Sequence, residues 1–173
     1  SFLLTISLML FLGFVTVTEA VFTPTTRTDL KTAVTACLNE DGGTGNCLTL
    51  AGTVWDGGSD VYGTIDSWNV SKITDLSQMF QSAASFTSDL SIWNVARVTT
   101  LYFTFQGASS FTSDLSKWNV ERVTDLGFTF KEAEAFTSDL SKWNVERVTS
   151  LYVTFQGASS FTSDLASWNV ARA

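Results

Sequence analysis

A repeat of 25 residues constrains this chain more than any other feature. The tripeptide Trp-Asn-Val occurs five times at this spacing, and Phe-Thr-Ser-Asp-Leu precedes each of the last four copies. A fixed period of this length is typical of repeat proteins, because one supersecondary unit cannot bury its apolar face alone and stacks on the next. The repeat therefore predicts a stack of cycles with a repetitive surface, and it disfavours a fold built around one enzyme pocket.

The first 20 residues predict a secretory signal peptide. Residues 1–17 are almost wholly apolar, and Thr18-Glu19-Ala20 is a small-x-small site of the kind that signal peptidase cuts. The alternative is an uncleaved membrane anchor, although the stretch is at the short end for a span and the cleavage motif follows it. We expect a secreted or cell-surface protein that has no membrane span after cleavage of the signal.

Charge and cysteine content narrow the possible partners. The net charge of −7 disfavours nucleic acid and anionic membranes. The two cysteines, Cys37 and Cys47, lie close together after the signal, and in an oxidising compartment such a pair forms one local disulfide. Without histidine or further cysteines, neither a metal site nor another cofactor is expected.

Three zones follow from these patterns. Residues 1–20 form the signal, residues 21–62 an atypical capping segment with the cysteines and one expected helix, and residues 63–173 the repeats. The repeat zone contains a half cycle and then four full cycles, which begin at Ile73, Val98, Val123 and Val148.

Within a cycle, the apolar spacing predicts one short helix and one short strand. Leu76, Met79, Phe80 and Ala83 follow one another at helical spacing, whereas residues 101–105 also alternate as a strand would, so both readings stay open for this half. The half with Asp-Leu-Ser-x-Trp suits a brief strand, whose copies would stack in parallel at ~4.8 Å. The expected fold class is an α/β repeat solenoid with an N-terminal helical disulfide cap.

The repeat Trp-Asn-Val-x-x-Val-Thr-x-Leu-x-x-x-Phe-x-x-Ala-x-x-Phe-x-x-Asp-Leu-Ser-x-Trp covers residues 62–172. It resembles the BspA-like leucine-rich-repeat surface proteins, whose repeat also occurs in mycoplasma surface lipoproteins. The resemblance implies a right-handed leucine-rich-repeat-like solenoid, a secreted or cell-surface location and, from bacterial members, a role in adhesion. Thr104, Thr129 and Thr154 depart from the family's usual Met, and Trp-Asn from its commoner Trp-Asp.

Stacking would bring equivalent side chains together as columns. The aromatic column is expected in the core, with an exposed stripe for stacking on sugars as the alternative. It consists of Trp68, Trp93, Trp118, Trp143 and Trp168. An asparagine column is expected at a turn, partly buried and bonded to the backbone of neighbouring cycles. It consists of Asn69, Asn94, Asn119, Asn144 and Asn169, of which Asn69 is also a weak candidate for N-glycosylation.

A column of aspartates needs a compensating interaction. Like charges at about 5 Å repel by ~0.8 kcal/mol in water and by ~3 kcal/mol at an effective dielectric constant of 20. We expect hydrogen bonds from turn N–H groups to offset this repulsion. The alternative, a column of Ca²⁺ ions, is disfavoured because one carboxylate per cycle falls short of the roughly six to eight oxygens that calcium prefers. The column consists of Asp89, Asp114, Asp139 and Asp164.

The sequence favours a binding or structural role over catalysis. The absence of histidine excludes a Ser-His-Asp triad, and a carboxylate pair for glycoside hydrolysis would have to come from Asp56, Asp60 and Asp66. We therefore expect a non-enzymatic surface module for protein interaction, adhesion or structure. The alternative is a module that binds a glycan or a regular lattice, for which the Thr-Ser rows that begin at Thr87 are candidates.

The end of the last cycle carries a further expectation. Ala173 stands where the next Val-Thr-x-Leu should begin, so the last cycle should expose its stacking face. This predicts either a longer array or end-to-end self-association through that face.

Overall fold

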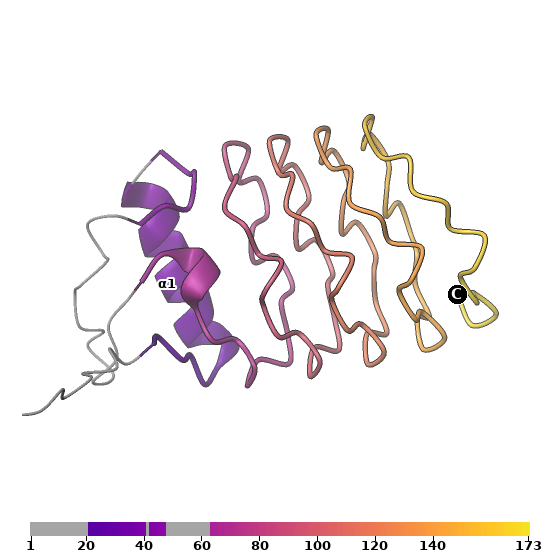
Figure 1. Cartoon of the computed structure of the whole chain (residues 1–173), viewed down its shortest axis with the longest axis horizontal. Helices are drawn as coiled ribbons and strands as arrows, with labels where there is room; N and C mark the ends of the chain where they lie inside the picture. Colours follow the sequence, from indigo (N-terminus) through magenta and orange to yellow (C-terminus); the bar gives the residue numbers. More distant parts are fainter. Residues whose placement is uncertain (1–20, 41, 48–62) are drawn as a thin grey trace, which may run out of the picture.

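The computed structural model describes residues 21–40, 42–47 and 63–173. Its regular elements are helix α1 (Arg27–Glu40) and the 3₁₀ helix η1 (Ile65–Ser67). The four cycles at 73–97, 98–122, 123–147 and 148–172 are called coils 1 to 4. Figure 1 shows them side by side in chain order, with α1 beyond coil 1 and the C-terminus on coil 4.

Helix α1 begins at a reciprocal cap. The Asp29 N–H donates to Thr26 Oγ1 at 3.1 Å, and the Thr26 N–H donates to Asp29 Oδ2 at 3.0 Å, so two N–H groups of the first turn are satisfied. The helix buries Leu30, Ala33, Val34 and Cys37. Cys37 is bonded to Cys47 with 4.8 Å between their Cα atoms, which confirms the expected disulfide.

Basic side chains of α1 cover the exposed carbonyls of coil 1. Arg27 Nη2 donates to Ser77 O, and Lys31 Nζ donates to Gln78 O at 2.7 Å and to Met79 O at 3.0 Å. Among the described residues no preceding coil donates to these carbonyls, and the helix supplies donors of the kind that coil 1 supplies to coil 2.

The coils are joined by backbone hydrogen bonds that run in one main direction. Leu101, Phe103 and Phe105 of coil 2 each donate an N–H to a carbonyl of coil 3, at 2.9–3.1 Å. The same pattern joins coil 1 to coil 2 and coil 3 to coil 4. In most of the hydrogen bonds between coils in this half of the cycle, the N–H group therefore points toward the C-terminal end and the carbonyl toward α1.

The expected fold class is wrong. In the described residues the structure contains no strand and no helix within a coil; each coil consists of turns and extended segments, with single parallel bridges at Asp75–Thr100, Thr100–Asp125 and Asp125–Ser150. The α/β leucine-rich-repeat solenoid, with a strand and a helix in every cycle, is therefore not formed. One physical reason is a left-handed residue in the predicted helix of each coil: φ is 56° at Phe103 and 58° at Phe128.

Aromatic rings fill the interior in columns. Phe80, Phe105, Phe130 and Phe155 stack with ring centroids 5.5–5.7 Å apart and planes within 8° of parallel. A second phenylalanine column, which begins at Phe86, repeats at 5.7–5.8 Å. Because the rings of successive coils stack on one another, each coil buries its apolar side against the next, and no coil has a separate core.

The threonines that depart from the family's usual methionine are buried and bonded. Thr104 Oγ1 donates to Leu101 O in its own coil at 2.7 Å and lies 3.0 Å from Leu76 O in the coil before. Thr129 Oγ1 has the equivalent pair of acceptors, Leu126 O at 2.8 Å and Leu101 O at 2.9 Å. Thr154 Oγ1 donates to Leu126 O of the preceding coil at 3.0 Å. A hydroxyl is tolerated in this core because carbonyl acceptors lie within its reach.

Candidate interaction surfaces

The tryptophan column belongs to the core. Trp68, Trp93, Trp118 and Trp143 are 2–4% exposed. From the second copy onward each indole Nε1–H donates to a carbonyl 28 residues earlier, for example Trp118 to Leu90 O at 2.9 Å. Trp168, in coil 4, makes the same bond to Leu140 O but is only partly buried. The buried indoles are therefore unavailable for stacking on a sugar, and they join each coil to the one before.

The aspartates are held by turn hydrogen bonds. Asp114 Oδ1 accepts the Ser116 N–H at 2.9 Å and the Ser138 hydroxyl of the next coil at 3.1 Å. Asp89 and Asp139 have the same pair of donors. The bond from the backbone N–H two residues on is the largest cause that lowers the pKa of each of these three carboxyls. Asp164 Oδ1 accepts the Ala166 N–H at 2.9 Å.

The asparagine column differs from the expectation. Each Asn side chain is exposed, and its Oδ1 accepts the N–H two residues later in its own turn, at 3.1–3.3 Å. The expectation of partly buried amides bonded to neighbouring coils is therefore wrong. The physical reason is reach, because a short amide side chain meets the N–H of its own turn first. Asn69 is thus exposed at the candidate glycosylation sequon.

A polar groove crosses coils 2 and 3. It has a volume of about 480 Å³ and carries hydroxyl, carboxylate and ammonium groups at equivalent positions of the two coils. Its lining residues are Thr112, Asp114, Ser116, Lys117, Thr137, Ser138, Asp139 and Lys142. Of the Thr-Ser rows, the threonines at 112 and 137 are exposed, whereas the serines at 113 and 138 are buried between coils. The hydroxyl surface is therefore a single threonine row.

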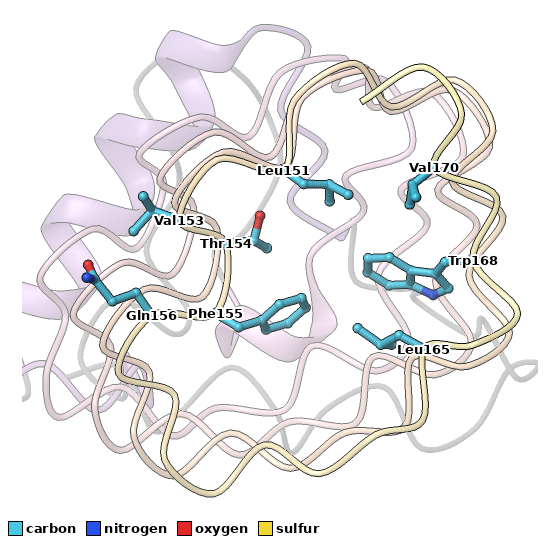
Figure 2. A pocket seen from close by; sticks show the side chains of 8 residues that line it. All are labelled: Leu151, Val153, Thr154, Phe155, Gln156, Leu165, Trp168 and Val170. Atoms are coloured by element: carbon cyan, nitrogen blue, oxygen red, sulfur yellow. The ribbon is translucent and has the colours of Figure 1, made fainter.

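On its exposed face, coil 4 has an open apolar pocket of about 450 Å³ (Figure 2). Leu151, Phe155, Leu165 and Trp168 point into the ring that the coil encloses, while Val153 lies at its outer side. In the described part of the chain, the N–H groups of Leu151, Val153 and Phe155 donate to no backbone carbonyl, although their equivalents in coil 3 donate to coil 4. The shape and donors of this face match the contacts that each coil makes with the next.

A patch of aromatic side chains that the sequence patterns did not predict lies outside the core. This aromatic patch consists of Tyr102, Phe103, Phe128 and Tyr152. Tyr152 is 67% exposed, Tyr102 is 36% exposed, and the two phenylalanines are partly exposed. The signal that could have revealed it is variation between near-identical cycles, since these two adjacent positions read Ser-Gln, Tyr-Phe, Gly-Phe and Tyr-Val.

The described residues do not form the catalytic carboxylate pair or the metal site that were considered as alternatives. Asp66 lies in η1, but Asp56 and Asp60 lie outside the described residues, as does the predicted signal at 1–20. Within the described ranges, no cluster of three Cys, Asp or Glu side chains could hold a metal ion. None of the helices described has both the length and the apolar character needed to cross a bilayer.

Comparison with known proteins gives one family. Residues 52–168 match the model of a family described as "Mycoplasma protein of unknown function, DUF285". No curated protein and no solved structure matches the chain significantly.

Proposed function

The chain belongs to the Mycoplasma protein family of unknown function DUF285, and we propose that it is a BspA-like surface repeat protein that binds another macromolecule outside the cell. Its repeats resemble those of surface proteins, and its first 20 residues have the pattern of a secretory signal. Adhesion, or assembly of a matrix or envelope, is the role that follows for such a module.

The observation that carries this proposal is the separation of core from surface in every coil. Most aromatic and aliphatic side chains pack in the core between coils, while one Asn, one Asp and two Thr side chains per coil are exposed to solvent at equivalent positions. Rows of identical polar groups on a packed scaffold suit a ligand that contacts several coils at once, and extended repeat proteins generally bind in this way.

Catalysis has no part in the proposal. Asp89, Asp114 and Asp139 accept the same kinds of hydrogen bond, so their surroundings are alike. Glycoside hydrolysis needs two carboxyl groups whose surroundings differ, one to donate a proton and one to act as base or nucleophile. The non-repeating candidates are tested by an Asp60→Asn/Asp66→Asn variant, which should differ from the parent in no hydrolytic assay on polysaccharide substrates.

Surface labelling tests the proposed location and role. Antibodies raised against residues 63–173 should label intact cells that produce the protein, and purified protein added in excess should reduce attachment of those cells to their substratum. Labelling that appears only after the cells are permeabilised would overturn the proposal. An antibody to a cytoplasmic protein serves as the control for cell integrity.

A further inference from the structure

We propose that the aromatic patch of Tyr102, Phe103, Phe128 and Tyr152 is a binding platform for an uncharged polysaccharide. This assignment rests on the proposed function, because it names the ligand class and the residues that such a surface module would use. It differs from the sugar-stacking alternative for the tryptophan column, whose members in coils 1 to 3 are buried.

The four rings form one continuous surface across three coils. Tyr102 packs edge-on against Phe103 with ring centroids 4.4 Å apart, and Phe103 stacks on Phe128 at 4.3 Å with planes 7° apart. Tyr152 packs edge-on against Phe128 at 5.1 Å. These contacts restrain each ring, so little side-chain freedom remains to be lost when a ligand binds.

The stacking of the coils does not require aromatic side chains here. Phe103 and Phe128 have φ of 56° and 58°, a left-handed conformation that costs a non-glycine residue roughly 1–2 kcal/mol. Gln78 and Val153 adopt the same conformation at the equivalent positions of coils 1 and 4. Since glutamine and valine serve the backbone there, the phenylalanines of coils 2 and 3 contribute a surface property.

Gly127 supports the same interpretation. It holds in coil 3 the position of the two tyrosines, and a Cβ atom there would lie 3.3 Å from Tyr102 Cδ2 and 3.0 Å from Asp125 Oδ1. The missing side chain therefore leaves room for the Tyr102 ring beside coil 3, which keeps the patch continuous.

The area of the patch decides between a sugar polymer and a protein partner. If a fully exposed aromatic side chain presents about 200 Å², the exposed areas of the four side chains sum to roughly 300 Å². A stable protein–protein interface buries about 800 Å² on each partner. The patch is too small for that, but it can accommodate a few sugar rings, whose C–H faces stack on aromatic rings. One pyranose ring is about as long as the 5.5–5.8 Å between equivalent core phenylalanines of adjacent coils.

The polar groups around the patch favour a neutral ligand. Asp125, which accepts the Gly127 N–H at 2.7 Å, stands between the two tyrosine-bearing coils, and Gln106 and Glu132 are bonded to each other at 3.3 Å on coils 2 and 3. Carboxylate and amide oxygens accept hydrogen bonds from sugar hydroxyls. Glu132 is also ion-paired with Lys131 at 3.3 Å, so it is Asp125 and the net charge of −7 that repel anionic polymers.

Binding to three neutral polysaccharides tests the assignment. The protein is mixed with insoluble cellulose, with insoluble chitin and with soluble laminarin, and the unbound fraction is measured against polysaccharide concentration. We expect saturable binding to at least one of them, weakened at least tenfold in the Tyr102→Ala/Tyr152→Ala variant. Ile92→Ala, which changes a side chain that is 75% exposed and outside the patch, should bind as the parent does.

Two further variants separate binding from folding. Tyr102→Phe/Tyr152→Phe keeps the rings and should retain most of the affinity. The alanine variant should stay folded, with a melting temperature only slightly below that of the parent, because Tyr152 is 67% exposed and Tyr102 packs only at the surface. The assignment is overturned if the parent binds none of the three polymers, or if the double alanine variant binds as well as the parent. Surface labelling of intact cells without polysaccharide binding overturns this assignment alone, whereas intracellular labelling overturns the proposed function.

Discussion

One serine in each of coils 2, 3 and 4 links the backbone of the preceding coil to the carboxylate row on its surface. Ser138 Oγ accepts the Leu115 N–H at 2.8 Å and donates to Asp114 Oδ1 at 3.1 Å, so one hydroxyl satisfies a backbone donor and a charged acceptor of the preceding coil. The arrangement repeats at Ser113 and Ser163.

Replacing this serine should cost more than replacing its exposed neighbour. Ser138→Ala leaves the buried Leu115 N–H without its acceptor, which should lower the free energy of unfolding by about 1–3 kcal/mol. Thr137→Ala is the matched control, and an exposed site of this kind should change the same quantity by about 0.5 kcal/mol or less. Urea denaturation followed by tryptophan fluorescence measures both. Equal effects of the two variants would contradict the role assigned to Ser138.

The aspartate column predicts a stability loss in acid. The pKa values of Asp89, Asp114 and Asp139 lie below their ordinary value of 3.8, mainly because a backbone N–H donates to each carboxylate. A folded pKa below the unfolded one contributes stability above the unfolded pKa, and this is lost as the pH falls through the folded pKa. The protein should therefore lose stability below about pH 4.

A variant that does not titrate isolates this contribution. Asp89→Asn/Asp114→Asn/Asp139→Asn keeps an acceptor for the N–H two residues on but loses the ionisable groups. The difference in melting temperature between the parent and this variant should shift in the variant's favour from pH 6 to pH 2.5, at constant ionic strength. A difference that is independent of pH would show that the hydrogen-bonded carboxylates are not coupled to folding.

The chemistry of single residues could be predicted only in part. That the aspartates need turn N–H donors follows from their charge and spacing, and the bonds to Ser91, Ser116 and Ser141 have that form. The aromatic patch could not be found in this way. Whether Tyr102 and Phe103 face inward or outward depends on a left-handed residue that no local preference for phenylalanine predicts.

Among the elements, α1 does for coil 1 what coil 1 does for coil 2. In coil 2, the carbonyls of Tyr102 and Thr104 accept N–H groups from Gln78 and Phe80. At the equivalent carbonyls of coil 1, basic side chains of α1 take the place of those donors. Cations suit this edge, because the carbonyls of the junctions point toward it and give it a partial negative charge.

Removing the α1 donors should therefore destabilise the molecule through coil 1. Lys31→Met keeps most of the aliphatic stem but deprives two carbonyls of their donor, and we expect the free energy of unfolding to fall by about 1–3 kcal/mol. Lys72→Met, at an exposed lysine, is the control. Hydrogen exchange should localise the effect to residues 73–97, and faster exchange in coils 3 and 4 with coil 1 unchanged would contradict it.

The secondary structure of a coil shows why the expected elements were wrong. Leu76, Met79, Phe80 and Ala83 are all buried, as their helical spacing requires, but a chain of turns buries the same set. A helix would use its N–H groups within the segment, four residues apart. In the coil, alternate N–H groups bond the next coil instead, so the repeat context outweighs a local preference that the spacing alone favours.

At the scale of the whole molecule, stability should be distributed by neighbours. Coils 2 and 3 each contact a coil on both sides, whereas coils 1 and 4 each contact one other coil among the described residues. The stability of a coil should therefore depend on how many neighbours it has. Repetition could be inferred from the 25-residue period alone. The direction of the hydrogen bonds between coils could not be inferred from the period. It depends on the backbone dihedral angles, and the same period is compatible with several ways of stacking the coils.

One substitution made in two coils tests this distribution. Phe130 is fully buried between Phe105 and Phe155, whereas Phe155 stacks on Phe130 and lines the exposed face of coil 4. Phe130→Ala removes contacts to two coils and should lower the free energy of unfolding by about 3–5 kcal/mol. Phe155→Ala loses contacts to one preceding coil, and we expect less than half that effect by urea denaturation. Equal losses would contradict a stability that depends on the number of neighbouring coils.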